Sequence, residues 1–553
     1  MNRNWWKESV VYQIYPRSFK DTTGDGIGDI PGIIGKLDYI KSLGIDVIWL
    51  CPVYESPNDD NGYDISNYRK ISEDFGGHEA FDTLLAQMHK KGLKLVMDLV
   101  ANHTSDEHFW FKESKKSKDN PYRDYYIWRD GKNNGPPTNW ESFFSGSAWE
   151  YNNDTQQYYL HYFTKKQPDL NWQNPKVRRE IFELLEYWFK KGVDGFRMDV
   201  ISLISKPDAF EDTQHSKFQD TILNTYANGP KIHQYLHEMN QEVLSKFDIM
   251  TVGEGPGIDL KNGPLYVDEK REELHMVFHF DHLYIDCGEG GKYDPVPYDL
   301  PKFKKVFSDW DKALKNGGWG SIFLGNHDFS RMVSRFGNDK EYHDTSAKLL
   351  VTLLLTMRGT VYIYQGDEIG MTNVAYPDID YYNDIETLNA WDEAKKNGQD
   401  MDAFLTIVHA QSRDNARTPM QWTDQKNSGF TDGEPWLSVN PNYTSINVAD
   451  QETCATSILN YYRDVIQLRK KNPVLVYGDY ECLYQEHTQL FVYRRWDDTS
   501  EFIILHNMGN QPEEFTPDFN VEKFKLCKSN LEDAAKGLFH LEPWQTKVLM
   551  RVD

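Results

Sequence analysis

Eight short apolar runs, rich in β-branched and aromatic residues, recur along the chain with amphipathic stretches between them. The runs are Val10–Tyr15, Val47–Cys51, Leu93–Val100, Val193–Val200, Ile249–Val252, Met276–Phe280, Ser321–Leu324 and Val361–Tyr364. The amphipathic stretches include Ile33–Ser42, His78–Lys91 and Val177–Lys191. Strand followed by helix, repeated eight times, predicts an α/β fold, a parallel (β/α)8 TIM barrel. The alternative, a doubly wound open sheet, usually begins with a Gly-rich turn, and no GxGxxG follows the first run.

Two segments depart from this rhythm and divide the 553-residue chain. From Thr104 to about Asn171 helical periodicity is lost and Trp, Tyr, Phe, Asn and Gly are frequent. Because a loop this long rarely lacks structure of its own, we expect it to fold locally after the third strand. After about Tyr477 the pattern alternates, which is typical of antiparallel strands. The predicted domains are the barrel (1–103 and 172–477), the inserted subdomain (104–171) and a C-terminal antiparallel β-sandwich (478–553).

The net charge of −24 disfavours a phosphate-rich partner, because binding phosphates requires clustered Lys and Arg. We therefore expect no nucleic-acid and no membrane partner. The longest apolar run, around Leu349 to Met357, is too short to cross a bilayer and contains Thr352 and Thr356. Aromatic residues make up 14% of the chain, which suits either a sugar-binding cleft or simply a large core.

Compartment is indicated by the cysteines and by the first residues. The five cysteines are scattered and form no CxxC pair: Cys51, Cys287, Cys454, Cys482 and Cys527. An odd, scattered set favours free thiols in a reducing compartment over a disulfide framework or a cysteine metal site. The opening MNRNWWKESV has no apolar core or cleavage-like site of a signal peptide. We expect a cytoplasmic protein.

Polar side chains gather where the predicted barrel strands end. They are Asp60, Tyr63, Asp64, Asn102, His103, Arg197, Asp199, Glu254, Asn326, His327, Asp328, Gln365, Asp367 and Glu368. A single Asp at such a place is more often a helix N-cap than a functional group. However, the carboxyl ends of barrel strands meet at one face, and burying so many ionisable groups there is costly without a purpose. The set therefore predicts one polar cavity at that face.

Carboxylates without metal-ligand spacing suit glycosidic cleavage, which needs one protonated and one ionised carboxyl group. Arg197 precedes Asp199 by two residues and shares its strand face, so it would hold Asp199 ionised and nucleophilic. Glu254 would then be the proton donor. In a retaining enzyme the two carboxyl groups lie about 5–5.5 Å apart.

Ordered motifs along nearly the whole chain carry a family resemblance. They are VVYQIYPRSFKDTTGDGIGD from Val10, DLVANH (Asp98–His103), QPDLNW (Gln167–Trp172), GFRMDV (Gly195–Val200), TVGE (Thr251–Glu254), NHD (Asn326–Asp328) and RDNARTPMQW (Arg413–Trp422). With these motifs the chain resembles glycoside hydrolase family 13, the α-amylase family, and within it the oligo-1,6-glucosidase and α-glucosidase subgroup. That resemblance implies an exo-acting retaining α-glucosidase.

The resemblance also implies a role for each matching residue. Asp199 is similar to the family's nucleophile, Glu254 to its general acid/base and Asp328 to its third carboxylate. The residues expected around the bound sugar are Asp60, Tyr63, His103, Phe163, Gln167, Arg197, His327 and Arg413. Among them, Asp60 and Arg413 would close the pocket over the non-reducing end, and Tyr63 and Phe163 would stack on the sugar.

Substrate preference rests on the residues around the leaving-group site. In this subgroup a valine after the nucleophile accompanies α-1,6 linkages or sucrose-type substrates, so Val200 favours isomaltose-like substrates. Gly255 and Phe329-Ser330 depart from the subgroup's usual residues near the same place. Sucrose isomerases share the framework but typically carry an arginine-rich loop after the sixth strand. The corresponding Asp281–Gly291 contains no arginine, which ranks an isomerase or transglucosylase below a hydrolase. A non-catalytic binding subunit is the remote alternative, because all three carboxylates are present.

A loop near the N-terminus has the composition of a calcium site. In DTTGDGIGD, oxygen-bearing side chains alternate around glycine turns, as a hard cation requires. The alternative is an acidic surface turn without metal. Members of the family that this chain resembles hold calcium at this loop. The resemblance therefore implies structural Ca²⁺ and no organic cofactor. The implied ligands are Asp21, Thr23, Asp25, the Ile27 backbone oxygen and Asp29. We expect a monomer or a weak homo-oligomer.

Overall fold

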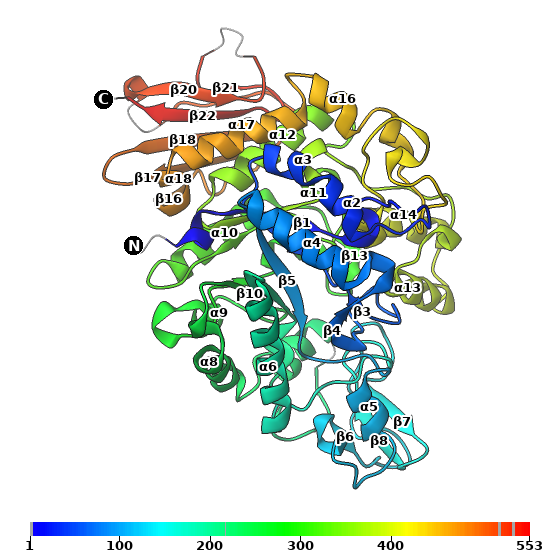
Figure 1. The fold of residues 1–553 in the computed structure, drawn as a ribbon. Coiled ribbons are helices and arrows are strands. Elements are labelled where there is room, and N and C mark those ends of the chain that lie inside the picture. The colour runs from blue at the N-terminus through cyan, green and yellow to red at the C-terminus, as the bar shows by residue number, and fades with distance from the viewer. Residues whose placement is uncertain (1–3, 216, 518–520, 533–536, 553) are drawn as a thin grey trace.

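The computed structural model describes residues 4–215, 217–517, 521–532 and 537–552. Within these residues, eight parallel strands form the central sheet in the order β11-β10-β9-β5-β2-β1-β15-β14. Their bounds are β1 Val10–Ile14, β2 Val47–Leu50, β5 Lys94–Val100, β9 Gly195–Asp199, β10 Met250–Glu254, β11 Met276–Phe278, β14 Ser321–Ile322 and β15 Thr360–Tyr364. Each predicted run overlaps one of these strands, so the predicted barrel is confirmed (Figure 1).

The two outer strands of this order lie against each other and close the barrel. Ser321 on β14 donates from Oγ to the Val277 carbonyl on β11 at 2.7 Å. The rings of Phe278 and Phe323 meet edge to face with centroids 5.0 Å apart. Closure therefore leaves no free sheet edge and directs the carboxyl end of each strand to one rim.

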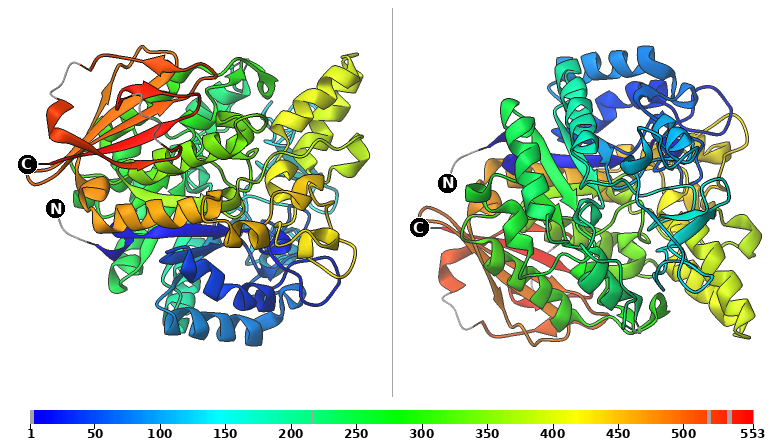
Figure 2. Two further views of the ribbon diagram at one scale, coloured as in Figure 1. Left: turned by 90° about the horizontal axis from the view of Figure 1, so that it is seen from above. Right: turned by 90° about the horizontal axis from the view of Figure 1, so that it is seen from below.

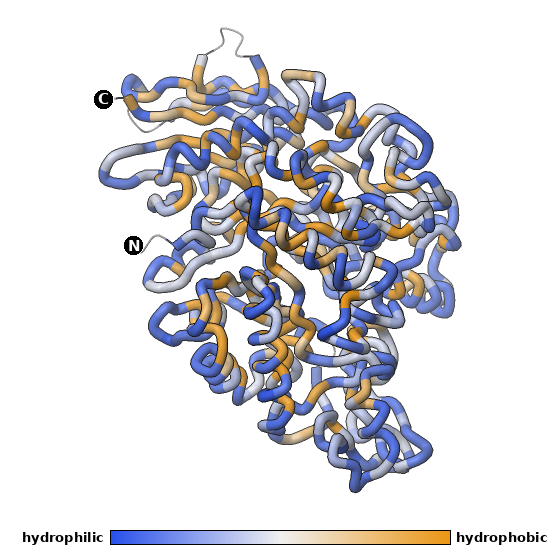
Figure 3. The backbone as a smooth tube through the Cα atoms, viewed as in Figure 1, coloured by the Kyte–Doolittle hydropathy of each residue, from blue (hydrophilic) through white to orange (hydrophobic). Residues whose placement is uncertain are grey.

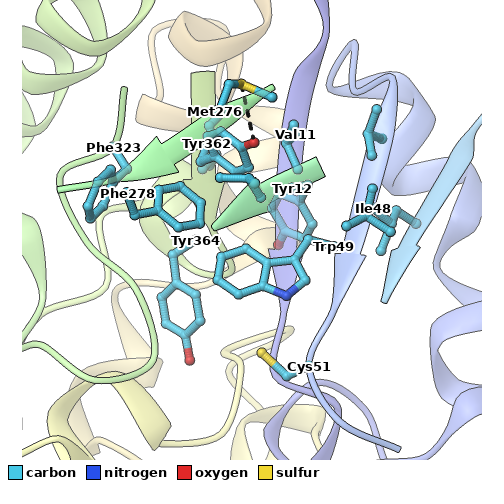
Figure 4. Close-up of a cluster of buried hydrophobic side chains, with 14 of the residues drawn as sticks. Val11, Tyr12, Ile48, Trp49, Cys51, Met276, Phe278, Phe323, Tyr362 and Tyr364 are labelled. Carbon is cyan, nitrogen blue, oxygen red and sulfur yellow. Dashed lines mark hydrogen bonds between the residues drawn. The ribbon is translucent and has the colours of Figure 1, made fainter. Parts of the chain in front are cut away.

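The interior of the barrel is filled by large side chains from several strands. Figure 4 shows Tyr12, Trp49, Phe278, Tyr362 and Tyr364 pointing into one cluster, and all are buried. Their bulk packs the axis so that the barrel is solid below its rim. A cavity can therefore form only at the rim, where the loops begin.

Helices cover the outside of the barrel. They include α4 (Gly77–Lys90), α6 (Pro175–Lys191), α8 (Ile232–Glu242), α10 (Leu300–Leu314), α12 (His343–Thr356) and α17 (Ile458–Lys471). In α6, Ile181, Leu185 and Trp188 recur at helical spacing on the buried face. Figure 3 shows the same pattern for the chain, with apolar residues along the central strands and polar residues on outer loops. The predicted helix Ile33–Ser42 is instead two short helices, α2 (Ile30–Gly35) and α3 (Leu37–Ser42), which meet at Lys36, where ψ is 4°.

The segment after the third barrel strand has its own small sheet. Strands β6 (Trp128–Arg129), β7 (Trp149–Asn152) and β8 (Gln157–Leu160) pair antiparallel in the order β6-β8-β7, beside helix α5 (Phe109–Ser114). Its aromatic residues pack locally, for example Phe111 against Trp128. An isolated antiparallel bridge joins His103 to Asp169 and returns the segment to the barrel rim.

The C-terminal segment is an antiparallel β-domain, as predicted. In its described part five strands run in the order β16-β17-β18-β22-β20, and β19 (Glu513–Glu514) pairs with β21 (His540–Leu541). The five are β16 Asp479–Leu483, β17 Leu490–Trp496, β18 Glu501–Asn507, β20 Phe524–Ser529 and β22 Thr546–Arg551. Figure 1 places this sheet and the segment around β6–β8 at opposite ends of the molecule, and Figure 2 shows the sheet beside α17.

Packing of this sheet explains the apolar run in α12. Thr356 is buried, and its Oγ1 lies 2.6 Å from Tyr493 Oη of β17. Thr352 likewise lies 2.8 Å from Tyr461 Oη of α17. The helix is apolar on all sides because barrel and C-terminal sheet both cover it. No helix in the described ranges combines the length and apolarity needed to cross a membrane.

Candidate active site

A cavity of about 390 Å³ opens at the carboxyl rim of the barrel. The predicted site residues that line it are Asp60, Tyr63, His103, Phe163, Asp199, Glu254, His327, Asp328 and Arg413. Segments separated by more than 350 residues thus meet around one space. Arg197 and Gln167 lie behind the wall, since Arg197 is 1% exposed and Gln167 is fully buried.

Arg197 joins the two central carboxylates from below. Its Nη1 lies 2.7 Å from Asp199 Oδ1, and its Nη2 lies 2.7 Å from Glu254 Oε2. Nη1 also lies 2.5 Å from Asp98 Oδ1 on the neighbouring strand β5. A planar guanidinium that forms ion pairs with three buried carboxylates fixes their relative positions. Asp199 and Glu254 therefore face one cavity as a pair.

The turn after β9 supplies a further contact to Glu254. Val200 has φ 36° and ψ 40°, a left-handed conformation that is unfavourable for a β-branched residue. In this conformation its backbone N–H donates to Glu254 Oε2 at 3.0 Å. The side chain of Val200 lines the cavity beside the pair. Strain at this residue is thus coupled to the placement of a reactive carboxyl group.

Burial dominates the titration of the pair. It raises the pKa of Asp199, and the charge of Glu254 raises this pKa further, against the opposing effect of Arg197. Burial also raises the pKa of Glu254, and the charge of Asp328 adds to this rise. Arg197 lowers the pKa of Asp199 as the sequence predicts, but burial outweighs it, so the expected net lowering is wrong. The pair therefore retains a proton at higher pH than two solvent-exposed carboxyl groups would. One protonated and one ionised carboxyl group is the state that glycosidic cleavage requires.

Asp328 has the opposite electrostatic environment. Its Oδ1 lies 2.8 Å from Arg417 Nη2 and 3.4 Å from Arg413 Nη1, and its Oδ2 lies 3.1 Å from His327 Nε2. Although burial alone would raise its pKa, His327, Arg417 and Arg413 together hold the pKa well below the usual range. Asp328 is therefore ionised at neutral pH and accepts hydrogen bonds.

The two histidines of the cavity are neutral at physiological pH. Burial lowers the pKa of His103 to about 4 and that of His327 to about 3. The ring of His327 stacks on Tyr63 with centroids 5.3 Å apart and an angle of 7°. Each ring can therefore donate one hydrogen bond without adding charge to the cavity.

Asp60 and Arg413 meet across the cavity, with Arg413 Nη2 3.8 Å from Asp60 Oδ1. Arg413 is held more closely by Asp384, at 2.7 Å. Burial raises the pKa of Asp60 to about 7 despite the nearby Arg413. Gln167 donates to Asp60 Oδ2 at 3.1 Å and is fully buried, so in this structure it supports Asp60 from behind.

Aromatic rings form two further parts of the wall. Phe163 stacks on Phe143, with centroids 4.9 Å apart. On the opposite side, Phe280 lies nearly parallel to Phe329 at 5.9 Å, and Tyr284 meets Phe329 edge to face at 5.6 Å. Flat apolar surfaces of this kind suit the faces of sugar rings.

Sequence reasoning missed several residues that shape this site. They are Gln13, Asp98, Lys292, Asp384, Glu386 and Arg417. Arg417 could have been found, since it follows Arg413 by four residues and both lie on one short helix, α15 (Asp414–Arg417), and its N-cap. Asp384 and Glu386 begin α13 (Ile385–Lys396), far from any barrel strand, and no sequence pattern connects them to the cavity.

The loop predicted to hold calcium is satisfied by its own donors. Asp21 Oδ1 accepts from the N–H groups of Thr23 and Gly24 at 2.7 and 2.9 Å, and Oδ2 accepts from Gly26 N at 2.8 Å. Asp29 Oδ1 accepts from Gly32 N at 2.7 Å and caps α2. Across the described ranges, no three His, Cys, Asp or Glu side chains are arranged to hold a metal ion. The oxygen-rich composition suits Ca²⁺, and calcium stays a prediction.

Comparison with known proteins identifies the family to which this architecture belongs. Residues 13–478 match the alpha amylase catalytic domain. The chain belongs to the alpha-amylase family. Among curated members of this family, an oligo-1,6-glucosidase of Parageobacillus thermoglucosidasius is 55% identical over 99% of both chains.

Two solved structures of the alpha-amylase family are similar along the whole chain. Isomaltulose synthase from Klebsiella sp. LX3 has a TM-score of 0.96 and 45% identity, and covers 100% of both chains. Bacillus licheniformis trehalose-6-phosphate hydrolase, in a mutant form, has a TM-score of 0.95 and 44% identity, also with full coverage. The family framework thus supports several reactions, and the cavity residues have to decide among them.

Proposed function

We propose that the protein is an exo-acting retaining α-glucosidase that removes terminal glucose from short oligosaccharides, with α-1,6 linkages or sucrose favoured. The observation that carries this proposal is the shared clamp of Arg197 on Asp199 and Glu254. It brings two carboxyl groups of raised pKa to one cavity wall, with the ionised Asp328 beside them. These are the groups that double displacement at a sugar carbon uses.

In the first step the Asp199 carboxylate attacks the anomeric carbon while the bond to the leaving oxygen breaks. Glu254 delivers its proton to that oxygen, and a β-glucosyl ester of Asp199 forms. In the second step the Glu254 carboxylate takes a proton from water, which attacks the same carbon and releases Asp199. Asp328 accepts hydrogen bonds from sugar hydroxyls and stabilises the positive charge that develops on the ring.

Exo-action follows from the closed end of the cavity. Asp60 and Arg413 approach each other there, and both are more than nine-tenths buried. A sugar whose non-reducing end meets these residues cannot extend beyond them. The substrate therefore projects its leaving group toward the opening, past Val200, Phe329 and Tyr284.

The preferred linkage is inferred from Val200 and from the relatives. The related proteins most similar in sequence include several oligo-1,6-glucosidases at 50–55% identity. A sucrose isomerase or transglucosylase on the same framework is the alternative, because isomaltulose synthases share the fold. The loop Asp281–Gly291, which carries no arginine, favours hydrolysis.

The charge of the cavity favours neutral sugars over sugar phosphates. In addition to the three central carboxylates, Asp60, Asp281 and Glu386 line it. Its cations are already paired, Lys292 with Glu386 at 3.0 Å and Arg413 with Asp384 at 2.7 Å. A phosphate group would find no free cation among these residues. The same acidic balance suits a small neutral sugar as partner. The five free cysteines support the further proposal of a cytoplasmic protein, and we propose a monomer or a weak homo-oligomer.

Initial rates and products on isomaltose, maltose, sucrose, trehalose and trehalose 6-phosphate test this function. We expect glucose release, with isomaltose or sucrose hydrolysed fastest and the first-released glucose in the α-configuration. A faster reaction with maltose or trehalose 6-phosphate would contradict the preference. Isomaltulose or another transfer product in place of free glucose would support the alternative.

A further inference from the structure

Gln13 contacts the candidate active site only through His327. It lies on β1 and is 2% exposed, and it is absent from the cavity wall. Its Nε2 lies 2.8 Å from His327 Nδ1 and donates to Cys51 Sγ at 3.3 Å. The amide nitrogen can only donate, so its two N–H groups are directed at His327 Nδ1 and Cys51 Sγ. Figure 4 shows Cys51 just beyond the end of β2, below the aromatic core.

The contact determines which nitrogen of His327 carries the proton. His327 is neutral, because burial lowers its pKa to about 3, so it has one N–H and one lone pair. Since Gln13 donates to Nδ1, the lone pair is at Nδ1 and the proton is at Nε2. Nε2 lies 3.1 Å from Asp328 Oδ2, an ionised carboxylate that can only accept. The Nε2–H tautomer satisfies both neighbours, and the Nδ1–H tautomer satisfies neither.

Besides Gln13, one group around His327 distinguishes its two nitrogens, and that group is Asp328. Tyr63 and Tyr15 stack on its two faces at 5.3 and 6.0 Å, and Trp49 meets its edge. These rings hold the plane of the imidazole but do not distinguish its nitrogens. The charged groups that face it are Asp328, Arg197, Arg417 and Arg413. Among these only Asp328 accepts a proton from the ring.

We propose that Gln13 is a positioning residue that, together with Asp328, holds His327 in the Nε2–H tautomer, so that His327 presents a donor to Asp328 and to the sugar hydroxyls beside it. Its role in catalysis rests on the proposed glycosidase function. The tautomer itself does not, and it can be measured in the folded protein without substrate. Partners that orient a functional histidine in this way typically affect activity by about 10- to 100-fold.

The first measurement is the protonation of His327 by NMR on full-length protein labelled with ¹⁵N-histidine, with the signal assigned by its loss in His327→Gln. We expect a bare Nδ1 and a protonated Nε2 across pH 5–8 in the native protein. In Gln13→Met, which has similar volume but no donor, Nδ1 loses its hydrogen bond while Asp328 still faces Nε2, so the Nδ1 signal should shift and the fraction of Nδ1–H should rise. A protonated Nδ1 in the native protein, or an unchanged signal in Gln13→Met, would overturn the proposal whether or not the protein cleaves glucosides.

The second measurement uses Gln13→Glu, which places a titratable group of the same shape against Nδ1. Below the pKa of the new carboxyl group its O–H can donate to Nδ1 and preserve the native tautomer. Above that pKa the carboxylate favours a proton on Nδ1 while Asp328 still favours one on Nε2, so His327 either becomes a charged imidazolium or gives up Nε2–H. We expect kcat/KM near native on the acid side and a fall with rising pH that begins below the alkaline limb of the native profile. A profile parallel to that of the native protein would refute the role.

Gln421→Met is the matched control. Gln421 is fully buried, and its Nε2 donates to Ile446 O at 2.5 Å and Asn442 Oδ1 at 3.1 Å, away from the cavity. Its substitution removes a buried amide of the same kind and should lower the melting temperature while the pH profile and the His327 signal stay native. If both Met variants change only stability, Gln13 is structural and the proposal fails.

Discussion

Arg417 Nη2 lies 2.8 Å from Asp328 Oδ1, and Arg417 Nε donates to the backbone carbonyl of His327 at 2.9 Å. The two contacts attach the third carboxylate and its neighbouring backbone to the helix that also carries Arg413 at its N-cap. Arg417 is 2% exposed and lies outside the cavity wall. It thus maintains the charge of Asp328 without touching the sugar.

Arg417→Gln should therefore raise the pKa of Asp328, which His327, Arg417 and Arg413 depress in the native protein. The acid limb of the kcat/KM profile should move to higher pH, with a loss of about 10- to 100-fold near neutrality. A carboxyl group whose pKa is depressed in the folded state stabilises the fold at pH values above its unfolded pKa. This stabilisation is lost as pH falls through the folded pKa. The drop in melting temperature should thus be larger at pH 7 than at pH 3. The exposed Arg551→Gln is the control, and an unmoved acid limb would exclude the assigned role.

Asp199→Ala should reduce turnover of isomaltose by at least about 10⁴-fold, because no other group can form the glucosyl ester. Arg197 keeps Asp98 and Glu254 as partners, so the melting temperature should change little. With an aryl α-glucoside, azide should restore reaction in this variant and give β-glucosyl azide. Glu254→Ala should instead retain much of the first step with the aryl glucoside, because a good leaving group needs no proton. Azide rescue that yields the α-azide would reverse the two assignments.

Asp60→Asn should lower activity and raise the stability of the fold at alkaline pH. Burial raises the pKa of Asp60 to about 7, above its unfolded value. A raised carboxyl pKa contributes stability below the unfolded pKa that is lost as pH rises through the folded value. Removing the charge should therefore raise the melting temperature at pH 8 and leave it unchanged at pH 4, while KM for isomaltose increases. The exposed Asp119→Asn should show neither effect, and an equal shift at both pH values would count against a buried charge at Asp60.

Val200→Thr should shift substrate preference from isomaltose toward maltose. The change keeps the β-branched shape and replaces one methyl group by a hydroxyl group in the part of the cavity where the leaving group lies. The ratio of kcat/KM for the two disaccharides reports this shift, and we expect it to change by about tenfold, within the 1–3 kcal/mol that single pocket contacts contribute. Val200→Ile, a larger apolar residue, is the comparison. If both variants keep the native ratio, another residue governs linkage.

Calcium binding at the N-terminal loop can be separated from the structural role of its aspartates. Asp21 accepts several hydrogen bonds from the loop backbone, so Asp21→Ala should lower the melting temperature with or without metal. Asp25 accepts only from Ile27 N among the described contacts, at 2.9 Å. Asp25→Ala should therefore abolish any increase in melting temperature that added CaCl₂ produces after EDTA treatment. Equal melting curves for the native protein in EDTA and in CaCl₂ would remove calcium from this loop.

Repeating local patterns were enough to predict the barrel. Each strand buried on both faces appears as a continuous apolar run, and its flanking helix has a periodic apolar face, so the eightfold alternation can be read without tertiary contacts. The same reasoning located Asp199, Glu254 and Asp328, because parallel strands deliver their ends to one rim. The family motifs added Gln167 and Arg413.

Only the tertiary structure decided the contacts between residues that no local sequence pattern links. Gln13 looks like any polar residue within a strand, and its meeting with His327 across 314 positions depends on barrel closure. Asp384 holds Arg413 from a helix outside the strand rhythm, and Gln167 supports Asp60 from behind the wall. Burial and neighbouring charges likewise set the direction of each pKa shift, because both exist only after folding. Sequence alone therefore determined which chemical groups reach the rim, and packing determined how each is held and charged.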